Sequence, residues 1–229
     1  MVKARRPTVR QDARPAGLAR MDGYTLVELL LSMGVGLVLM SAAVFVARQT
    51  TLASNVLMDG SSTQEEVQYS VEWISSALRA AGTNPYRIIA GACPAANTTF
   101  TPIRLDPNGT GRADNIRIHA DVNPPNGLLG GLSGACTEPG EDLTIAHDLT
   151  NLCITRRDNN IDQAAVPMTD RVISSMRFTY LNAQGVATAI AAQVAYVQVS
   201  ITGRTIARDV GRGAAATYTL TSDVRVRLR

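Results

Sequence analysis

The stretch "GYTLVELLLSMGVGLVLMSAAVFVARQT" at residues 23–50 decides how the rest of the chain is interpreted. Residues 24–47 are apolar except for four polar side chains: Thr25, Glu28, Ser32 and Ser41. As an α-helix these 24 residues rise about 36 Å, more than the roughly 30 Å hydrocarbon core of a bilayer. A secretory signal peptide has a shorter apolar core with a small-residue cleavage site, whereas this run continues into Arg48 without a break. Residues 24–47 are therefore predicted to form a retained transmembrane helix.

The positive charge of the chain is concentrated before that helix. Residues 1–23 carry six of the 22 Lys and Arg but only two of the 19 acidic residues, which leaves 16 basic and 17 acidic side chains in the rest. A nucleic-acid-binding domain has a basic stripe on its folded part, so DNA binding is not predicted. Residues 1–23 are interpreted as a basic leader, or alternatively as a disordered cytoplasmic tail, and the start is either Met1 or Met21. Because a basic flank stays cytoplasmic, residues 48–229 are expected on the far side of the inner membrane.

The helical pattern continues beyond the apolar run. Apolar residues recur at three- and four-residue steps and form one stripe: Leu52, Val56, Val67, Val71, Ile74, Leu78 and Ala81. This pattern predicts an amphipathic second half at residues 48–82, within one helix that runs from about residue 24 to 81. Gly60 is its weak point, because an interior glycine costs about 1 kcal/mol relative to alanine. Gly82, followed by Thr-Asn-Pro, predicts the end of the helix.

The remaining residues, 83–229, have the pattern of a β-rich domain. Runs with alternating or β-branched composition predict strands at residues 115–120, 142–147, 152–156, 172–181, 194–202 and 218–228. Polar turn sequences at residues 148–151 and 182–185 predict hairpin turns. The amphipathic half of the helix needs an apolar surface to cover it, and this domain supplies one. The sequence therefore predicts an α+β fold in which a long N-terminal helix packs on an antiparallel sheet.

The segment Gly23-Tyr24-Thr25-Leu26-Val27-Glu28 and the apolar run after it resemble the class III signal of the type IV pilin family. The family usually has Phe where this chain has Tyr24, a conservative difference. The resemblance implies a pilin-like fold and a prepilin peptidase that cuts between Gly23 and Tyr24, which removes residues 1–23. It also implies N-methylation of the new terminal amine of Tyr24.

Several short phrases outside the signal are similar to PilW-type minor pilins, which share a fold with pseudopilin J of type II secretion: "AGTNPYRI", "LDPNGTGRADNIRIHADVN", "GEDLTIAHD", "MTDRVISSMRFTYLNAQG" and "SDVRVRLR". This resemblance implies a minor pilin that primes or caps a type IV pilus and supports motility, adhesion or DNA uptake. The implied partners are prepilin peptidase, other minor pilins, the major pilin and the inner-membrane assembly platform. The implied location is the inner membrane, with residues 83–229 periplasmic, and later the pilus. A type II secretion pseudopilin and a single-pass membrane receptor with a periplasmic binding domain are the alternatives.

Glu28 is costly in the middle of an apolar segment, by about 2.5–3.5 kcal/mol on insertion scales. Cleavage after Gly23 creates a positive amine at Tyr24, which a carboxylate at low dielectric can neutralise. The partner amine belongs either to a neighbouring subunit, in which case the pair selects axial register during assembly, or to the same chain. A Glu28 that extends to the membrane surface is the structural alternative. The sequence predicts Glu28 as the assembly residue.

Few other residues have a spacing typical of chemistry. The chain lacks nucleotide-binding and nucleophile motifs, and His119 and His147 are interpreted as strand residues, so no enzymatic activity is predicted. Asp106, Asn108 and Asp114 resemble the start of a calcium loop. The position of its bidentate glutamate is Arg117, however, so an Asx-rich turn is expected here, no cofactor is predicted, and calcium binding is the alternative.

Three cysteines lie beyond the membrane helix, where a disulfide can form. Three pairings are open. The expected pair is Cys93–Cys136, because both lie in loop-like sequence, and Cys153 is expected to be a buried free thiol in a strand. A disulfide that closes this loop contributes roughly 3–4 kcal/mol on the chain-entropy model.

Overall fold

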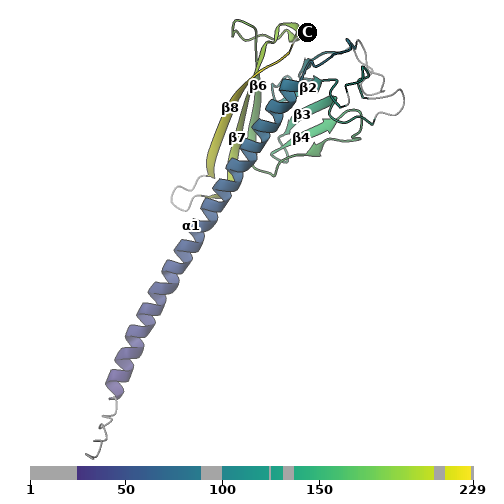
Figure 1. Ribbon diagram of the computed structural model, residues 1–229. Helices are drawn as coiled ribbons and strands as arrows, with labels where there is room; N and C mark the ends of the chain where they lie inside the picture. Colours follow the sequence, from purple (N-terminus) through teal and green to yellow (C-terminus); the bar gives the residue numbers. More distant parts are fainter. Residues whose placement is uncertain (1–24, 89–99, 124, 131–136, 209–214, 228–229) are drawn as a thin grey trace, which may run out of the picture. The chain divides into compact units, whose positions relative to one another are not determined.

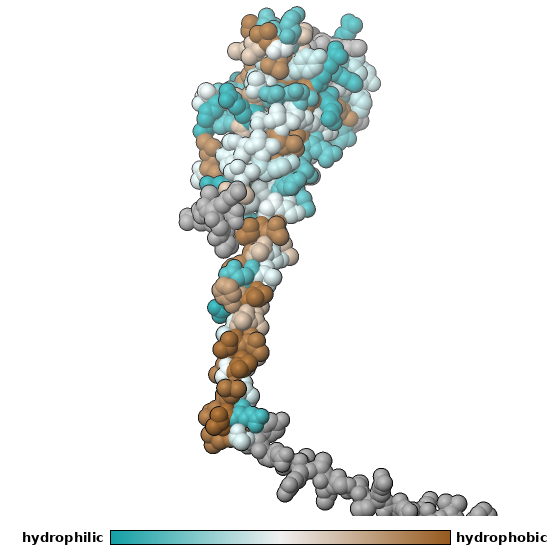
Figure 2. Space-filling view, turned by 90° about the vertical axis from the view of Figure 1, so that its left-hand side faces the viewer, coloured by the Kyte–Doolittle hydropathy of each residue, from teal (hydrophilic) through white to brown (hydrophobic). Residues whose placement is uncertain are grey.

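The computed structural model describes residues 25–88, 100–123, 125–130, 137–208 and 215–227. The chain divides into two compact units, residues 1–49 and 50–229. A single long helix, α1 (Leu26–Ala80), includes described residues of both units (Figure 1). It is the one helix among the described residues that is long and apolar enough to cross a membrane. Within the first unit every described residue of α1 is exposed, and Figure 2 shows this segment as a mostly apolar surface.

In the second unit, α1 buries one face from Thr63 onward. Its buried residues are Thr63, Val67, Ser70, Val71, Ile74, Ser75 and Leu78. The predicted stripe is therefore confirmed from Val67 to Ala81. It is wrong at Leu52, which is 46% exposed, because the sheets cover α1 only from Thr63. Gly60 lies within the continuous helix, so the lost helix propensity of one glycine does not end it.

The helix ends at Ala80, within one residue of the predicted end, and the predicted stop residue Gly82 follows it. This residue has φ +78°, a left-handed conformation that glycine adopts without the steric cost of a Cβ. A Cβ on Gly82 would also collide with the carbonyl oxygen of Arg227. The Gly82 N–H donates to the carbonyl of His119 over 3.0 Å, so the end of the helix is bonded directly to a strand.

Five strands form the first sheet, in the order β1-β2-β3-β4-β5, and all pairs are antiparallel. They are β1 (Ile103–Leu105), β2 (Asn115–His119), β3 (Asp142–Asp148), β4 (Cys153–Asp158) and β5 (Val166–Pro167). The first three predicted strands, at residues 115–120, 142–147 and 152–156, correspond to β2, β3 and β4. The three-residue β1 and two-residue β5 were not predicted, because such short segments show no alternation.

The second sheet has the order β6-β7-β8, also antiparallel. Its strands are β6 (Ile173–Leu181), β7 (Tyr196–Arg208) and β8 (Ala215–Arg225), and a short 3₁₀ helix, η1 (Ala191–Gln193), precedes β7. Val197, Val199 and Ile201 of β7 alternate into the core. The predicted bounds of β7 and β8 are wrong at both ends: β7 is Tyr196–Arg208 in place of residues 194–202, and β8 is Ala215–Arg225 in place of residues 218–228. The long β7–β8 ladder, which pairs Arg208 with Ala215, accounts for both extensions.

The two sheets and the helix share one hydrophobic core. Hydrogen bonds between backbone groups join the sheets, from Ile173 N–H to the Leu152 carbonyl (2.8 Å) and from Phe178 N–H to the Ala113 carbonyl (2.7 Å). The core cluster includes Ile74 and Leu78 of α1, strand residues of both sheets and the fully buried ring of Phe178. The α+β class is therefore confirmed, with two antiparallel sheets in place of the single sheet expected.

The helix lies close to the second sheet at Gly203 of β7. A Cβ at this position would lie 2.6 Å from Val67 Cγ2 and 2.7 Å from Thr63 Cγ2, so there is no space for any other residue. The absence of a side chain at Gly203 thus permits the contact between α1 and β7.

Candidate functional site

The apolar segment of α1 begins with a capped turn. The Glu28 N–H donates to Thr25 Oγ1 over 3.3 Å, and the Leu29 N–H donates to the Thr25 carbonyl. Thr25 is therefore the N-cap residue, and Thr25-Leu-Val-Glu28 has the spacing of a capping box. The proposed cleavage residues Gly23 and Tyr24 lie outside the described residues.

Glu28 lies in the first turn of α1 and is exposed. A carboxylate at this position interacts favourably with the positive end of the helix dipole. This stabilising contribution was not considered from the sequence, although the Thr-x-x-Glu pattern was visible there. The interaction with the helix dipole lowers the free-energy cost of an acidic residue at the start of an apolar helix. It also leaves the Glu28 carboxylate able to pair with a positively charged group.

The candidate calcium loop is organised by hydrogen bonds to Asp106. Asp106 Oδ1 accepts from the Thr110 N–H, the Thr110 hydroxyl and the Asn115 amide, and Oδ2 accepts from the Gly111 N–H, over 2.7–3.0 Å. The hydrogen bond from Asn115 is the main cause that lowers the pKa of Asp106 to about 2. Asn108 and Asp114 are bonded instead to Asn115. Among the described residues no group of three or more His, Cys, Asp or Glu is arranged to hold a metal ion. The expectation of no cofactor, with calcium as the alternative, stays a prediction.

Both histidines lie in strands, as predicted, and both are buried. His147 Nε2 lies 3.0 Å from the Ile173 carbonyl, and His119 Nε2 lies 3.4 Å from Asp142 Oδ1. Asp142 also binds Arg117, whose Nε donates to Oδ1 over 2.6 Å and whose Nη2 donates to Oδ2. Burial favours a higher pKa for Asp142, but the hydrogen bonds from Arg117 and the charges of Arg117 and His119 outweigh it and lower the pKa to about 2. Arg117 and Asp142 are thus bound to each other, whereas the buried His119 Nε2 forms no hydrogen bond within the described part of the chain and has only its 3.4 Å contact with Asp142.

Two further buried carboxylates hold the loop that precedes β3. Glu141 accepts hydrogen bonds from the N–H groups of Val122, Asn123 and Gly130. Asp121 accepts from the N–H groups of residues 126 and 127. Burial raises the pKa of Glu141, although these three N–H groups lower it. The loop is therefore shaped around two carboxylates that sequence analysis did not identify.

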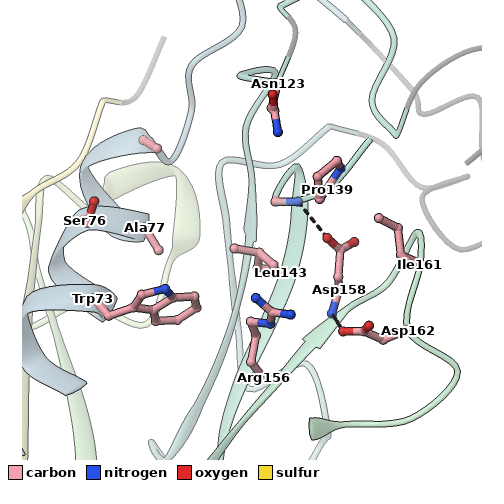
Figure 3. Close-up of a pocket in the computed structure, with 12 residues that line it drawn as sticks. Trp73, Ser76, Ala77, Asn123, Pro139, Leu143, Arg156, Asp158, Ile161 and Asp162 are labelled. Atoms are coloured by element: carbon pink, nitrogen blue, oxygen red, sulfur yellow. Dashed lines mark hydrogen bonds between the residues drawn. The ribbon is translucent and has the colours of Figure 1, made fainter. Parts of the chain in front are cut away.

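An open groove of about 500 Å³ lies between α1 and the five-stranded sheet (Figure 3). Helix residues form one wall, with Trp73 directed toward Leu143 and Arg156 across the groove. Asp158 and Asp162 lie further along the opposite side. Asp158 accepts from the Gly140 N–H over 2.7 Å, and Asp162 accepts from the Asp158 N–H over 2.8 Å.

The cysteine predictions are tested at one position. Cys153 is buried in β4 and, within the described part of the chain, is a free thiol, as expected. Burial raises its pKa, so the thiol stays protonated at neutral pH. Cys93 and Cys136, the expected disulfide pair, lie outside the described residues.

No protein-family model, curated protein or solved structure matches the chain. Two features of the chain bear on its function: the capped apolar helix with Glu28 in its first turn, and the groove beside Trp73.

Proposed function

We propose that the chain is a prepilin that matures into a minor pilin of a type IV pilus. The observation that carries the proposal is the Gly23–Glu28 signal directly before an uninterrupted helix whose first part is apolar and exposed. An apolar helix without internal partners needs lipid before assembly and other helices afterwards. The α+β layout, with the second part of α1 packed on antiparallel sheets, agrees with a pilin-like fold.

In this proposal prepilin peptidase removes residues 1–23 and methylates Tyr24 at the inner membrane. The new amine lies four residues before Glu28, about one helical turn. Thr25 caps the first turn, which fixes the direction of the helix at the point where Glu28 meets the amine of a neighbouring subunit. An unpaired charge at low dielectric costs several kcal/mol, so subunits in the wrong axial register are rejected. Other minor pilins, the major pilin and the assembly platform are the proposed partners.

Processing is tested by mass spectrometry of the protein from membranes of a host with prepilin peptidase. The mature chain should begin at an N-methylated Tyr24. Gly23→Glu should remain full length, because the peptidase requires a small residue before the cut. A wild-type chain that retains residues 1–23 in the presence of active peptidase would refute the proposal.

Assembly is tested separately with Glu28→Ala. The variant should insert and be cleaved like the wild type, but its amount in sheared filaments should fall by about tenfold or more, because the buried amine loses its partner. Glu65→Ala is the matched control, since Glu65 is an exposed glutamate of α1 beyond the apolar segment. Equal incorporation of Glu28→Ala and Glu65→Ala would contradict the role of Glu28.

A further inference from the structure

The groove between α1 and the five-stranded sheet combines an aromatic wall with a polar side. Its apolar lining comes from Trp73, Ala77, Ala80, Pro139, Leu143 and Ile161, and its polar lining from Ser76, Asn123, Arg156, Asp158 and Asp162. A volume of about 500 Å³ is within the range of sites for small ligands, roughly 300–1,000 Å³. The lining is thus suited to a ligand that has both an apolar face and many polar atoms.

Trp73 is the only tryptophan of the chain. It is half-buried, packs against the hydrophobic core and lines the groove at the same time. Among the described residues its indole N–H has no hydrogen-bond partner. Tryptophan combines a large rigid apolar surface with one donor, so an unpartnered indole on a groove wall is a platform for an amphipathic ligand.

The opposite side of the groove offers donors and acceptors together. The guanidinium of Arg156 forms no ion pair or hydrogen bond with another described residue, so its N–H groups are available. Asp158 and Asp162 each use carboxylate oxygens to accept backbone N–H groups but retain further lone pairs. The three charged side chains sum to −1, which does not favour a strongly anionic ligand.

We propose that this groove binds a hexopyranose unit of a neutral saccharide. One face of a pyranose ring presents C–H groups, which stack on an indole, and its edge presents hydroxyls that both donate and accept. Arg156 would donate to the hydroxyl oxygens, and Asp158 and Asp162 would accept from the hydroxyl hydrogens. An extended peptide fits less well, because the polar groups gather at one side of a single aromatic platform instead of following a strand edge.

The sole tryptophan makes the site directly observable. The full chain is purified in lauryldimethylamine oxide, whose headgroup is not a sugar, and Trp73 emission is followed during titration. The probes are disaccharides and methyl glycosides of glucose, galactose, mannose and N-acetylglucosamine. At least one should give a saturable change in emission and reduce quenching by acrylamide. Glucitol, which has the hydroxyls but no ring, should give no saturable change.

Two arginine variants distinguish the groove from nonspecific effects. Arg156→Ala should weaken the affinity by about tenfold or more, because it removes a charged hydrogen-bond donor. Arg177→Ala, at an exposed position of β6 outside the groove, should change the affinity by less than about twofold. Asp162→Asn, with circular dichroism to verify folding, tests the hydrogen-bond acceptor on the side of the groove opposite Trp73 and should also weaken the affinity for the saccharide.

Several results would overturn the proposal. The first is the absence of a saturable change in Trp73 emission with any probe, and the second is an equal change with glucitol. The third is an unchanged affinity for saccharide in both Arg156→Ala and Asp162→Asn. Binding of peptides but not of saccharides to the same groove would assign it to a protein partner. None of these results bears on cleavage after Gly23, so the pilin proposal is judged independently.

Discussion

The close contact between α1 and β7 supports a quantitative prediction at Gly203. In Gly203→Ala the new Cβ would lie 2.6 Å from Val67 Cγ2 and 2.7 Å from Thr63 Cγ2. Neither neighbour can turn away easily, because both are β-branched and buried and the Thr63 hydroxyl is held by the carbonyl of Asp59. The helix and β7 must therefore move apart.

The expected loss in the free energy of unfolding follows from two opposing effects. Overpacking of a close contact costs about 1–3 kcal/mol. Replacing glycine by alanine in a strand returns roughly 0.5–1 kcal/mol of backbone entropy. The mid-values of the two ranges predict that Gly203→Ala destabilises the chain by about 1 kcal/mol, and the extremes set an upper bound of about 2.5 kcal/mol. Gly60→Ala is the control, because nothing lies within 4 Å of its Cβ and alanine favours the helix by about 1 kcal/mol.

The assay is urea denaturation of the full chain in detergent, followed by the emission of Trp73. A double-mutant cycle adds Gly203→Ala to a background with Thr63→Ser and Val67→Ala, which removes both clashing methyl groups. In that background Gly203→Ala should be neutral or stabilising. Equal destabilisation in the two backgrounds, or no destabilisation in the wild type, would refute the steric argument.

Two further predictions are checked with the same urea denaturation assay. Arg117→Met should cost about 3–5 kcal/mol at pH 7, because it leaves the buried Asp142 carboxylate without its main partner. The folded pKa of Asp142 is lowered from 3.8 to about 2, so its contribution to stability is present above about pH 4 and lost as the pH falls through 2. The difference between Arg117→Met and the wild type should shrink over that range, and a difference that is constant with pH would contradict this assignment. Gly82→Ala should destabilise more than Gly185→Ala, because both require positive φ but only Gly82 also meets a carbonyl, that of Arg227; equal losses would show that the contact is unimportant.

The long helix and most strands were predictable because their sequence patterns are local. An apolar run followed by a three- and four-residue stripe predicts α1, and Gly82 has the special backbone that its position at the helix end implies. The ends of β7 and β8 were not predictable, since they depend on how far the two strands pair. Residue Leu52 fits the stripe but lacks a surface to cover it.

The sites depend more strongly on tertiary structure. Arg117 and His119 lie two residues apart on one strand, but only the β2–β3 register places Asp142 opposite His119. The groove needs the rotation of α1 that turns Trp73 toward Arg156, and no spacing in the sequence encodes it. By contrast, Thr25 and Glu28 are close in sequence, so their capping pattern was accessible without a structure.

The contact between Gly82 and Arg227 has a consequence for the loops that lie between them in the sequence. The polypeptide leaves the helix at Gly82 and returns to the same point about 145 residues later. Loops along this excursion can lengthen, shorten or change without moving either attachment point. A change of loop length between residues 83 and 226 therefore need not alter the end of α1 or the backbone that packs against it.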